Sequence, residues 1–178
     1  MFTKMLLSDI LKLDLVRKNV VIIGAPSSGK TYLSEKMKEV YPYHNFIHSD
    51  DFIQYGFEDG LYEMIREVKK TDKYCIVEGI LCYRLLRKGV EQGSFSPDYV
   101  IQTYITDDDL EKAYKDKNEP EKLPKVRSLI KSNQTVFELY CGMEKQKTPI
   151  FIELVREEEI VEVDKPEKPA KPAKGAKK

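Results

Sequence analysis

The chain has 178 residues, of which 41% are hydrophobic and 34% charged, and its 30 basic residues balance its 30 acidic ones. This length suits a single domain with a sizeable core, since a typical domain has roughly 100–200 residues. No apolar run approaches the ~20 residues of a membrane-spanning helix, so we expect no membrane partner. A net charge of zero argues against a domain that holds nucleic acid by bulk attraction.

The charge is unevenly distributed along the chain. Residues 164–178 carry six Lys and two acidic residues, a net charge of +4, which leaves −4 on residues 1–163. This tail has no large apolar side chain and cannot bury enough surface to offset the entropy of ordering it. We therefore expect residues 161–178 to form a disordered Lys/Pro/Ala-rich tail, which either solubilises the protein or contacts an anionic partner weakly.

The cysteines and the N-terminus indicate the compartment and the start of the domain. Three cysteines without a CxxC pair (Cys75, Cys82 and Cys141) favour buried thiols in a cytoplasmic protein over a disulfide framework or a zinc site. Near the N-terminus, Met5, Leu6, Ile10 and Leu13 are spaced like one face of a helix. We expect residues 1–18 to form a helical extension that packs on a domain of residues 19–160.

Strand-like and helix-like segments alternate after this extension. The expected strands are residues 19–23, 46–48, 74–77, 99–105 and 150–155. The expected helices cover about 29–40, 58–70, a stretch ending near 88, a segment from 107 capped by Thr106, and 126–146. Such alternation predicts an α/β fold with a mostly parallel sheet of five strands, which binds ligands at the carboxyl ends of its strands.

The strongest motif follows the first of these strands, where eight residues fit the pattern G-x-x-x-x-G-K-[ST] in full. Glycines let the backbone curl so that its N–H groups point at phosphate oxygens, and the next helix adds its positive N-terminal dipole. We expect Lys30 to reach the phosphates of a nucleoside triphosphate and the Thr31 hydroxyl to ligate Mg²⁺. The candidate nucleotide-binding residues are Gly24, Ala25, Pro26, Ser27, Ser28, Gly29, Lys30 and Thr31. Between a strand and a helix, this motif predicts a three-layer P-loop NTPase fold.

Carboxylates follow the second and third strands. Asp50 and Asp51 come after the second strand, where one carboxylate near the γ-phosphate could accept the proton of an attacking hydroxyl. We favour Asp50 as this base over Asp51, and over a role as a turn cap. Glu78 ends the third strand, where it could hold Mg²⁺ or orient a substrate hydroxyl, or simply be a solvated terminus. Thr31, Asp50 and Glu78 are the candidate metal ligands.

These motifs carry a resemblance. GAPSSGKT, then SDDF about twenty residues later, then a strand ending in VEGIL resemble the uridine kinase and nicotinamide riboside kinase group of small P-loop kinases, over roughly residues 19–105. The resemblance implies that Asp50 is the base and that Glu78 is the glutamate of that group's third motif. The D-D-aromatic element also occurs in polynucleotide kinases and zeta-toxin-like kinases, so the resemblance defines the reaction better than the substrate.

Basic residues that could close over the phosphates are sparse. The segment after the fourth strand has one arginine, Arg127, and three lysines spaced among acidic residues: Lys112, Lys115 and Lys117. These side chains fit a lid and a solvated helix face equally well. Arg84, in the helix after Glu78, could reach the substrate or the γ-phosphate, and a surface role for it is as consistent with the sequence. Tyr55, Phe57, Tyr62 and Tyr83 could stack on a base or pack in the core.

Together these features predict a kinase that moves the γ-phosphoryl group of ATP, with Mg²⁺, to a hydroxyl of a small nucleoside- or nucleotide-like acceptor. Its candidate catalytic residues are Lys30, Asp50, Glu78 and Arg84. One alternative is a polynucleotide 5′-hydroxyl kinase, against which the acidic domain argues because it shows no basic stripe to follow a strand. Another is a module that hydrolyses ATP slowly and regulates a partner.

Overall fold

The computed structural model describes residues 2–71, 73–145 and 147–156, so the expected tail lies outside the described residues. Within them the chain folds around one sheet of six parallel strands in the order β1-β6-β5-β2-β4-β3. The strands are β1 (Thr3–Met5), β2 (Val20–Gly24), β3 (Asn45–His48), β4 (Cys75–Glu78), β5 (Tyr99–Thr103) and β6 (Ile150–Leu154). The α/β class and the parallel sheet are confirmed, but the prediction of five strands is wrong.

The sixth strand comes from the N-terminal segment that we expected to be wholly helical. Residues Thr3–Met5 pair in parallel with β6, with Thr3 opposite Ile152, and the carbonyl oxygen of Met5 accepts a hydrogen bond from Val155 N at 3.0 Å. Only Leu7–Ile10 form a helix, α1. A strand of three residues is too short for its alternation of apolar and polar side chains to stand out in the sequence. These residues form a strand because the edge of β6 offers hydrogen-bond partners to their backbone groups.

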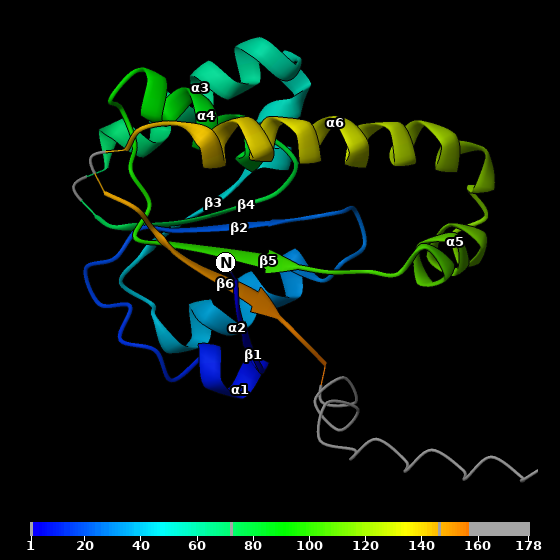
Figure 1. The fold of residues 1–178 in the computed structure, drawn as a ribbon, viewed down its shortest axis with the longest axis horizontal. Coiled ribbons are helices and arrows are strands. Elements are labelled where there is room, and N and C mark those ends of the chain that lie inside the picture. The colour runs from blue at the N-terminus through cyan, green and yellow to red at the C-terminus, as the bar shows by residue number, and fades with distance from the viewer. Residues whose placement is uncertain (1, 72, 146, 157–178) are drawn as a thin grey trace, which may run out of the picture.

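Helices cover both faces of the sheet. Figure 1 shows α3, α4 and α6 on one face, α1 and α2 on the other, and α5 beyond the carboxyl ends of the strands. These helices are α2 (Lys30–Val40), α3 (Phe57–Lys70), α4 (Cys82–Glu91), α5 (Asp107–Asp116) and α6 (Leu123–Gly142), with short 3₁₀ helices at Ser49–Tyr55 (η1) and Pro120–Lys122 (η2). The three-layer arrangement therefore agrees with the prediction.

The centre of the sheet positions the site. All five residues of β2 are buried, as expected for a β-branched strand covered on both faces. β2 lies between β5 and β4, with Gly24 opposite Thr103 and Ile22 opposite Glu78, and β3 follows β4 with His48 opposite Glu78. The carboxyl ends of four neighbouring strands therefore meet where the loop after β2 begins.

The long helix α6 differs from its expected bounds at both ends. It begins at Leu123, with Pro124 in the first turn, where a missing N–H costs no helical hydrogen bond, and it ends at Gly142. Among the described residues no helix is both long enough and apolar enough to cross a bilayer.

Candidate functional site

The loop between β2 and α2, which we call the phosphate loop after the motif that it contains, has left-handed backbone positions of the kind that its glycines predict. Ser27 and Gly29 adopt left-handed φ angles of 63° and 90°. A side chain at Gly24 would have its Cβ 2.1 Å from Thr103 Oγ1 and 2.7 Å from Thr103 O, so only glycine lets the loop pass the end of β5. The path of the loop thus depends on the close approach of Gly24 to β5 as well as on the left-handed backbone at Gly29.

Hydroxyl groups hold this loop against the sheet. Ser28 Oγ donates to Ala25 O at 2.7 Å and lies 2.5 Å from Thr103 Oγ1, which in turn is 3.3 Å from the carbonyl oxygen of Ile23. Thr103 is buried at the last position of β5. These contacts order the loop before any phosphate binds.

Lys30 is the first residue of α2, and its ammonium group is folded into the loop. Its Nζ donates to Ala25 O at 2.7 Å. Burial lowers the pKa of Lys30 below its usual 10.5, and the nearby negative charges of Glu78 and Asp50 oppose that shift. The ammonium group therefore contacts the loop backbone and lies close enough to Glu78 and Asp50 for their charges to act on it.

Glu78 is the centre of a hydrogen-bonded network. Its Oε1 accepts from Thr31 Oγ1 at 3.1 Å and from His48 Nδ1 at 2.8 Å, and the residue is only 4% exposed. His48 reaches it because β3 and β4 are parallel and in register at their last residues. A buried carboxylate needs such partners, since it loses the hydration that would otherwise stabilise its charge. The network joins three separate elements: α2, β3 and β4.

Asp50 lies against the turn that follows Glu78. Gly79 has a φ of 119°, and a Cβ there would lie 2.1 Å from Ser49 Oγ and 3.3 Å from Asp50 Oδ1. Ser49 is fully buried, and its hydroxyl accepts a hydrogen bond from Leu81 N at 3.1 Å. The Ser49 anchor thus holds Asp50 beside the Glu78–Gly79 turn. The negative charge of Asp50 is among those that act on the pKa of Lys30.

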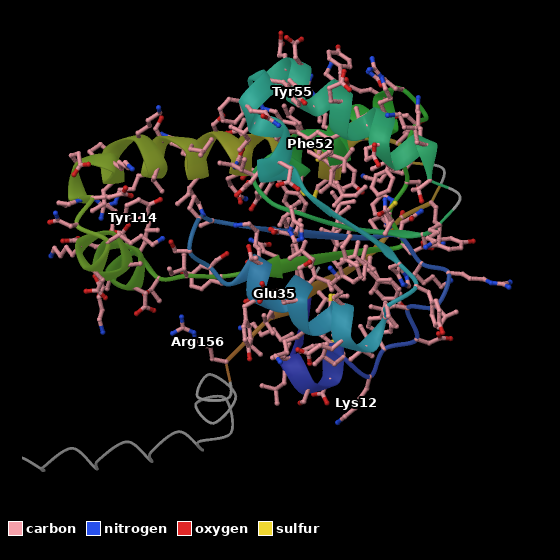
Figure 2. The ribbon with its side chains drawn as sticks, turned by 180° about the vertical axis from the view of Figure 1, so that it is seen from behind. Lys12, Glu35, Phe52, Tyr55, Tyr114 and Arg156 are labelled. Carbon is pink, nitrogen blue, oxygen red and sulfur yellow. The ribbon has the colours of Figure 1, made fainter. Side chains whose placement is uncertain are left out.

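Arg84 lies in a different part of the site. Its guanidinium carbon is 5.2 Å from the centre of the Phe57 ring, so it bridges the first turn of α4 and the start of α3. Among the described residues, Arg84 makes no hydrogen bond or ion pair with the phosphate loop, Asp50 or Glu78. Of the aromatic residues, Tyr83 is buried against Phe137, whereas Tyr55 and Phe57 are exposed. Figure 2 shows Phe52 nearer the sheet and Tyr55 on the outer rim.

Two basic residues of α5 and α6 are paired with neighbouring acids. Arg127 makes two hydrogen bonds to Asp107, at 2.9 and 2.6 Å, and Lys115 pairs with Glu111 at 2.8 Å. Lys117, just after α5, behaves differently, because its Nζ donates to Ser27 Oγ in the phosphate loop at 3.0 Å. Among the predicted lid residues, Lys117 is therefore the one seen in contact with the loop.

The donor set fits a magnesium ion that is shared with a nucleotide. Mg²⁺ in such sites takes one or two protein oxygens and completes its octahedron with water and phosphate oxygens. Thr31 and Glu78 place a hydroxyl and a carboxylate oxygen 3.1 Å apart beside the loop. The described residues contain no cluster of three or more His, Cys, Asp or Glu for a metal site made by the protein alone.

Comparisons with known proteins add little to this geometry. No family model matches the chain. No curated protein matches it either. Among solved structures, it is similar to shikimate kinase from Acinetobacter baumannii in complex with shikimate, with 16% identity and a TM-score of 0.48, over 80% of this chain and 89% of that one. At this level the likeness concerns the course of the chain and says nothing of what this protein binds.

Three site residues were not predicted from the sequence. His48 and Thr103 end strands beside Glu78 and Gly24, and Ser49 anchors the turn that carries Asp50. The signal that could have found them is register, because parallel strands that end together place their last residues side by side. That signal requires the strand order, which the sequence does not contain.

Proposed function

We propose that this protein is an ATP-dependent phosphotransferase that moves the γ-phosphoryl group to a hydroxyl of a small nucleoside- or nucleotide-like acceptor. The observation that supports it best is the Glu78 carboxylate, which accepts a hydrogen bond from Thr31 of the phosphate loop while Asp50 lies beside the next residue. A loop that binds nucleotide and a carboxylate that can take a proton thus meet at one edge of the sheet.

The reaction requires a phosphate-binding group and a base. Lys30 would exchange its hydrogen bond with Ala25 O for the β- and γ-phosphate oxygens, and so neutralise charge where it develops. Asp50 accepts the proton of the acceptor hydroxyl as that oxygen bonds to the γ-phosphorus and the bond from the γ-phosphorus to the bridging oxygen breaks, which releases ADP. The transition state is held mainly by position and charge, since phosphoryl transfer asks little covalent chemistry of the protein.

Magnesium has a defined place in this proposal. Thr31 and Glu78 would hold the ion, which neutralises charge on the β- and γ-phosphates when it is bound. His48 acts as a positioning residue, because its hydrogen bond at 2.8 Å fixes the Glu78 oxygen that also accepts from Thr31.

The sparse lid supports a second candidate, a module that hydrolyses ATP slowly and regulates a partner. Arg127 and Lys115 are held in ion pairs with acids of α5, and among the expected lid residues Lys117 is the one that contacts the loop. With few cations over the γ-phosphate, the site would exclude water less completely than an efficient transferase does. Water would then compete with the acceptor for the γ-phosphoryl group.

A screen of acceptors separates the two functions. The wild-type protein is incubated with γ-labelled ATP, Mg²⁺ and panels of nucleosides, nucleotides and oligonucleotides with free 5′-hydroxyls, with Lys30→Ala as the control that loses nucleotide binding. We expect a labelled small acceptor. Label found only in oligonucleotides would favour the polynucleotide kinase, and label found only in inorganic phosphate would favour the regulatory ATPase.

A further inference from the structure

A cavity of about 350 Å³ opens between α3, α4 and α6, outside the phosphate loop. Its positive side chains come from α4, which supplies Arg84, Arg87 and Lys88. Its other lining includes the ring of Tyr62 and the side chain of Leu61, with Glu58 as the single acidic residue. A cavity that combines an aromatic wall with three cations suits a ligand that is both planar and anionic.

The charges of this cavity are only partly balanced. Arg87 and Lys88 share one carboxylate, that of Glu91, at 2.8 and 3.0 Å. Arg84 has no ion pair with any acidic residue that the structure describes, and its guanidinium lies over the Phe57 ring instead. Counting Glu58 and Glu91 against the three cations leaves one positive charge in excess. Arg84 is the group that can give its N–H donors to an anion without breaking an existing pair.

The apolar side of the cavity is also left available. Tyr62 of the lining is 52% exposed, and Phe57, which lies beside the lining under the Arg84 guanidinium, is 40% exposed, although both belong to a helix whose other face is in the core. Aromatic rings in such positions provide a stacking surface for a planar group, and the Arg84–Phe57 contact already shows how a flat cation uses one of them.

Two helices that line this cavity, α3 and α4, begin a few residues after the segments that carry Asp50 and Glu78. Phe57 begins α3 two residues after η1 ends, and Arg84 lies in the first turn of α4, six residues after Glu78. Gly60 of α3 packs so closely on η1 that a Cβ there would lie 2.4 Å from Phe52 O. The same Cβ would lie 3.6 Å from Leu81, just before α4. The helices that form the cavity therefore start at the segments that carry Asp50 and Glu78.

We propose that this cavity binds the acceptor by an anionic group, so that the acceptor is a nucleoside monophosphate whose base stacks on the aromatic wall and whose phosphate pairs with Arg84. This inference rests on the proposed function and narrows it, because a neutral nucleoside would leave Arg84 and the excess positive charge unused. In this proposal a sugar hydroxyl of the ligand is presented to Asp50, which receives its proton.

The test compares each nucleoside with its 5′- and 3′-monophosphates as acceptors, by kcat/KM with γ-labelled ATP. We expect a monophosphate to be preferred at least about tenfold, and Arg84→Gln to remove that preference by raising KM, since a charge-assisted hydrogen bond contributes about tenfold or more. Lys88→Gln should reduce it severalfold. Arg66→Gln, an arginine of α3 that pairs with Glu63 outside the cavity, is the matched control and should leave it unchanged.

The inference is overturned if nucleosides serve as well as their monophosphates, or if Arg84→Gln lowers kcat/KM equally for both. A calorimetric titration of the monophosphates into the protein without ATP separates this failure from failure of the proposed function. Binding that Arg84→Gln weakens would support the anion site even if no acceptor is phosphorylated. The absence of binding, or equal binding by the variant, would contradict it.

Discussion

The carboxyl ends of β2, β3 and β4 lie at the phosphate loop, and the segment of α5 and α6 reaches the loop through Lys117, but the two regions are built differently. At the strand ends the polar groups come from distant parts of the chain and meet under burial, as Glu78 does with Thr31 and His48. On α5 and α6 the charged groups are mostly exposed, and those that pair do so with neighbours on the surface, as Arg127 does with Asp107.

This difference indicates where function should be sensitive to substitution. A buried carboxylate with two donors is fixed before a ligand arrives, so changing it alters geometry and charge together. Exposed ion pairs are solvated, contribute little, and can be replaced by water. We therefore expect large effects at the strand ends and small ones on α5 and α6, with Lys117 between them.

The largest effect is expected from Asp50→Asn, which keeps the shape of the side chain but cannot accept the proton. Turnover should fall by about 10²–10⁴-fold, the usual contribution of a general base, while ATP affinity should stay within about twofold. Steady-state transfer assays and calorimetry measure the two quantities. Asp51→Asn is the matched control, and an equal loss in that variant would remove the distinction between the two aspartates.

Glu78→Gln should follow, because it removes the charge that we propose holds Mg²⁺ while it can still accept from Thr31. The Mg²⁺ concentration needed for half-maximal activity should rise by roughly 10²-fold or more, at or above the upper end of the 10–100-fold range of changes that act through a ligand's neighbours. A titration of activity against Mg²⁺ gives the value. An unchanged Mg²⁺ requirement would show that Glu78 has a structural role only.

His48→Gln tests the positioning of Glu78 and should have a smaller effect. We expect the Mg²⁺ requirement to rise about tenfold, because the carboxylate loses one of its two donors. His44→Gln is the control, since His44 bonds the carbonyl oxygens of Leu15 and Lys18 at the opposite end of β3. If both variants shift the Mg²⁺ titration equally, the effect of His48 is not specific to the site.

Lys117→Met and Arg127→Gln compare the two kinds of cation near α5. Losing the Lys117 contact with Ser27 should lower kcat/KM about three- to tenfold, since an exposed charge that approaches phosphate contributes modestly. Arg127→Gln should change kcat/KM by less than twofold, because its partners are acids of α5. A larger loss in Arg127→Gln than in Lys117→Met would mean that α6 supplies the cation over the phosphates.

Most of the strand-end region could be predicted from the sequence, because each of its motifs lies within a few consecutive residues. The phosphate loop, Asp50 and Glu78 each follow a recognisable strand, and a parallel sheet brings such positions to one edge. His48 and Thr103 could not be predicted, since their roles depend on which strands are neighbours. β1 was missed for the same reason, as its three residues gain their partners only from β6.

The contacts made by the charged residues of the α5–α6 region could not be predicted from the sequence. Its charge pattern was compatible with a lid and with a solvated surface, and its basic residues make different contacts in the structure. Arg127 is paired within the segment, whereas Lys117 turns towards Ser27. A difference of this kind depends on side-chain direction at the end of a helix, which periodicity alone does not define.

The most direct test follows the γ-phosphoryl group through a single turnover. The protein is mixed in excess over γ-labelled ATP with a saturating acceptor from the screen, and label is counted in the acceptor, in inorganic phosphate and in remaining ATP. We predict that the wild type transfers most label to the acceptor and that Asp50→Asn leaves it in bound ATP. Label released to water at equal rates in both proteins would contradict the assignment of Asp50 as the base of a kinase.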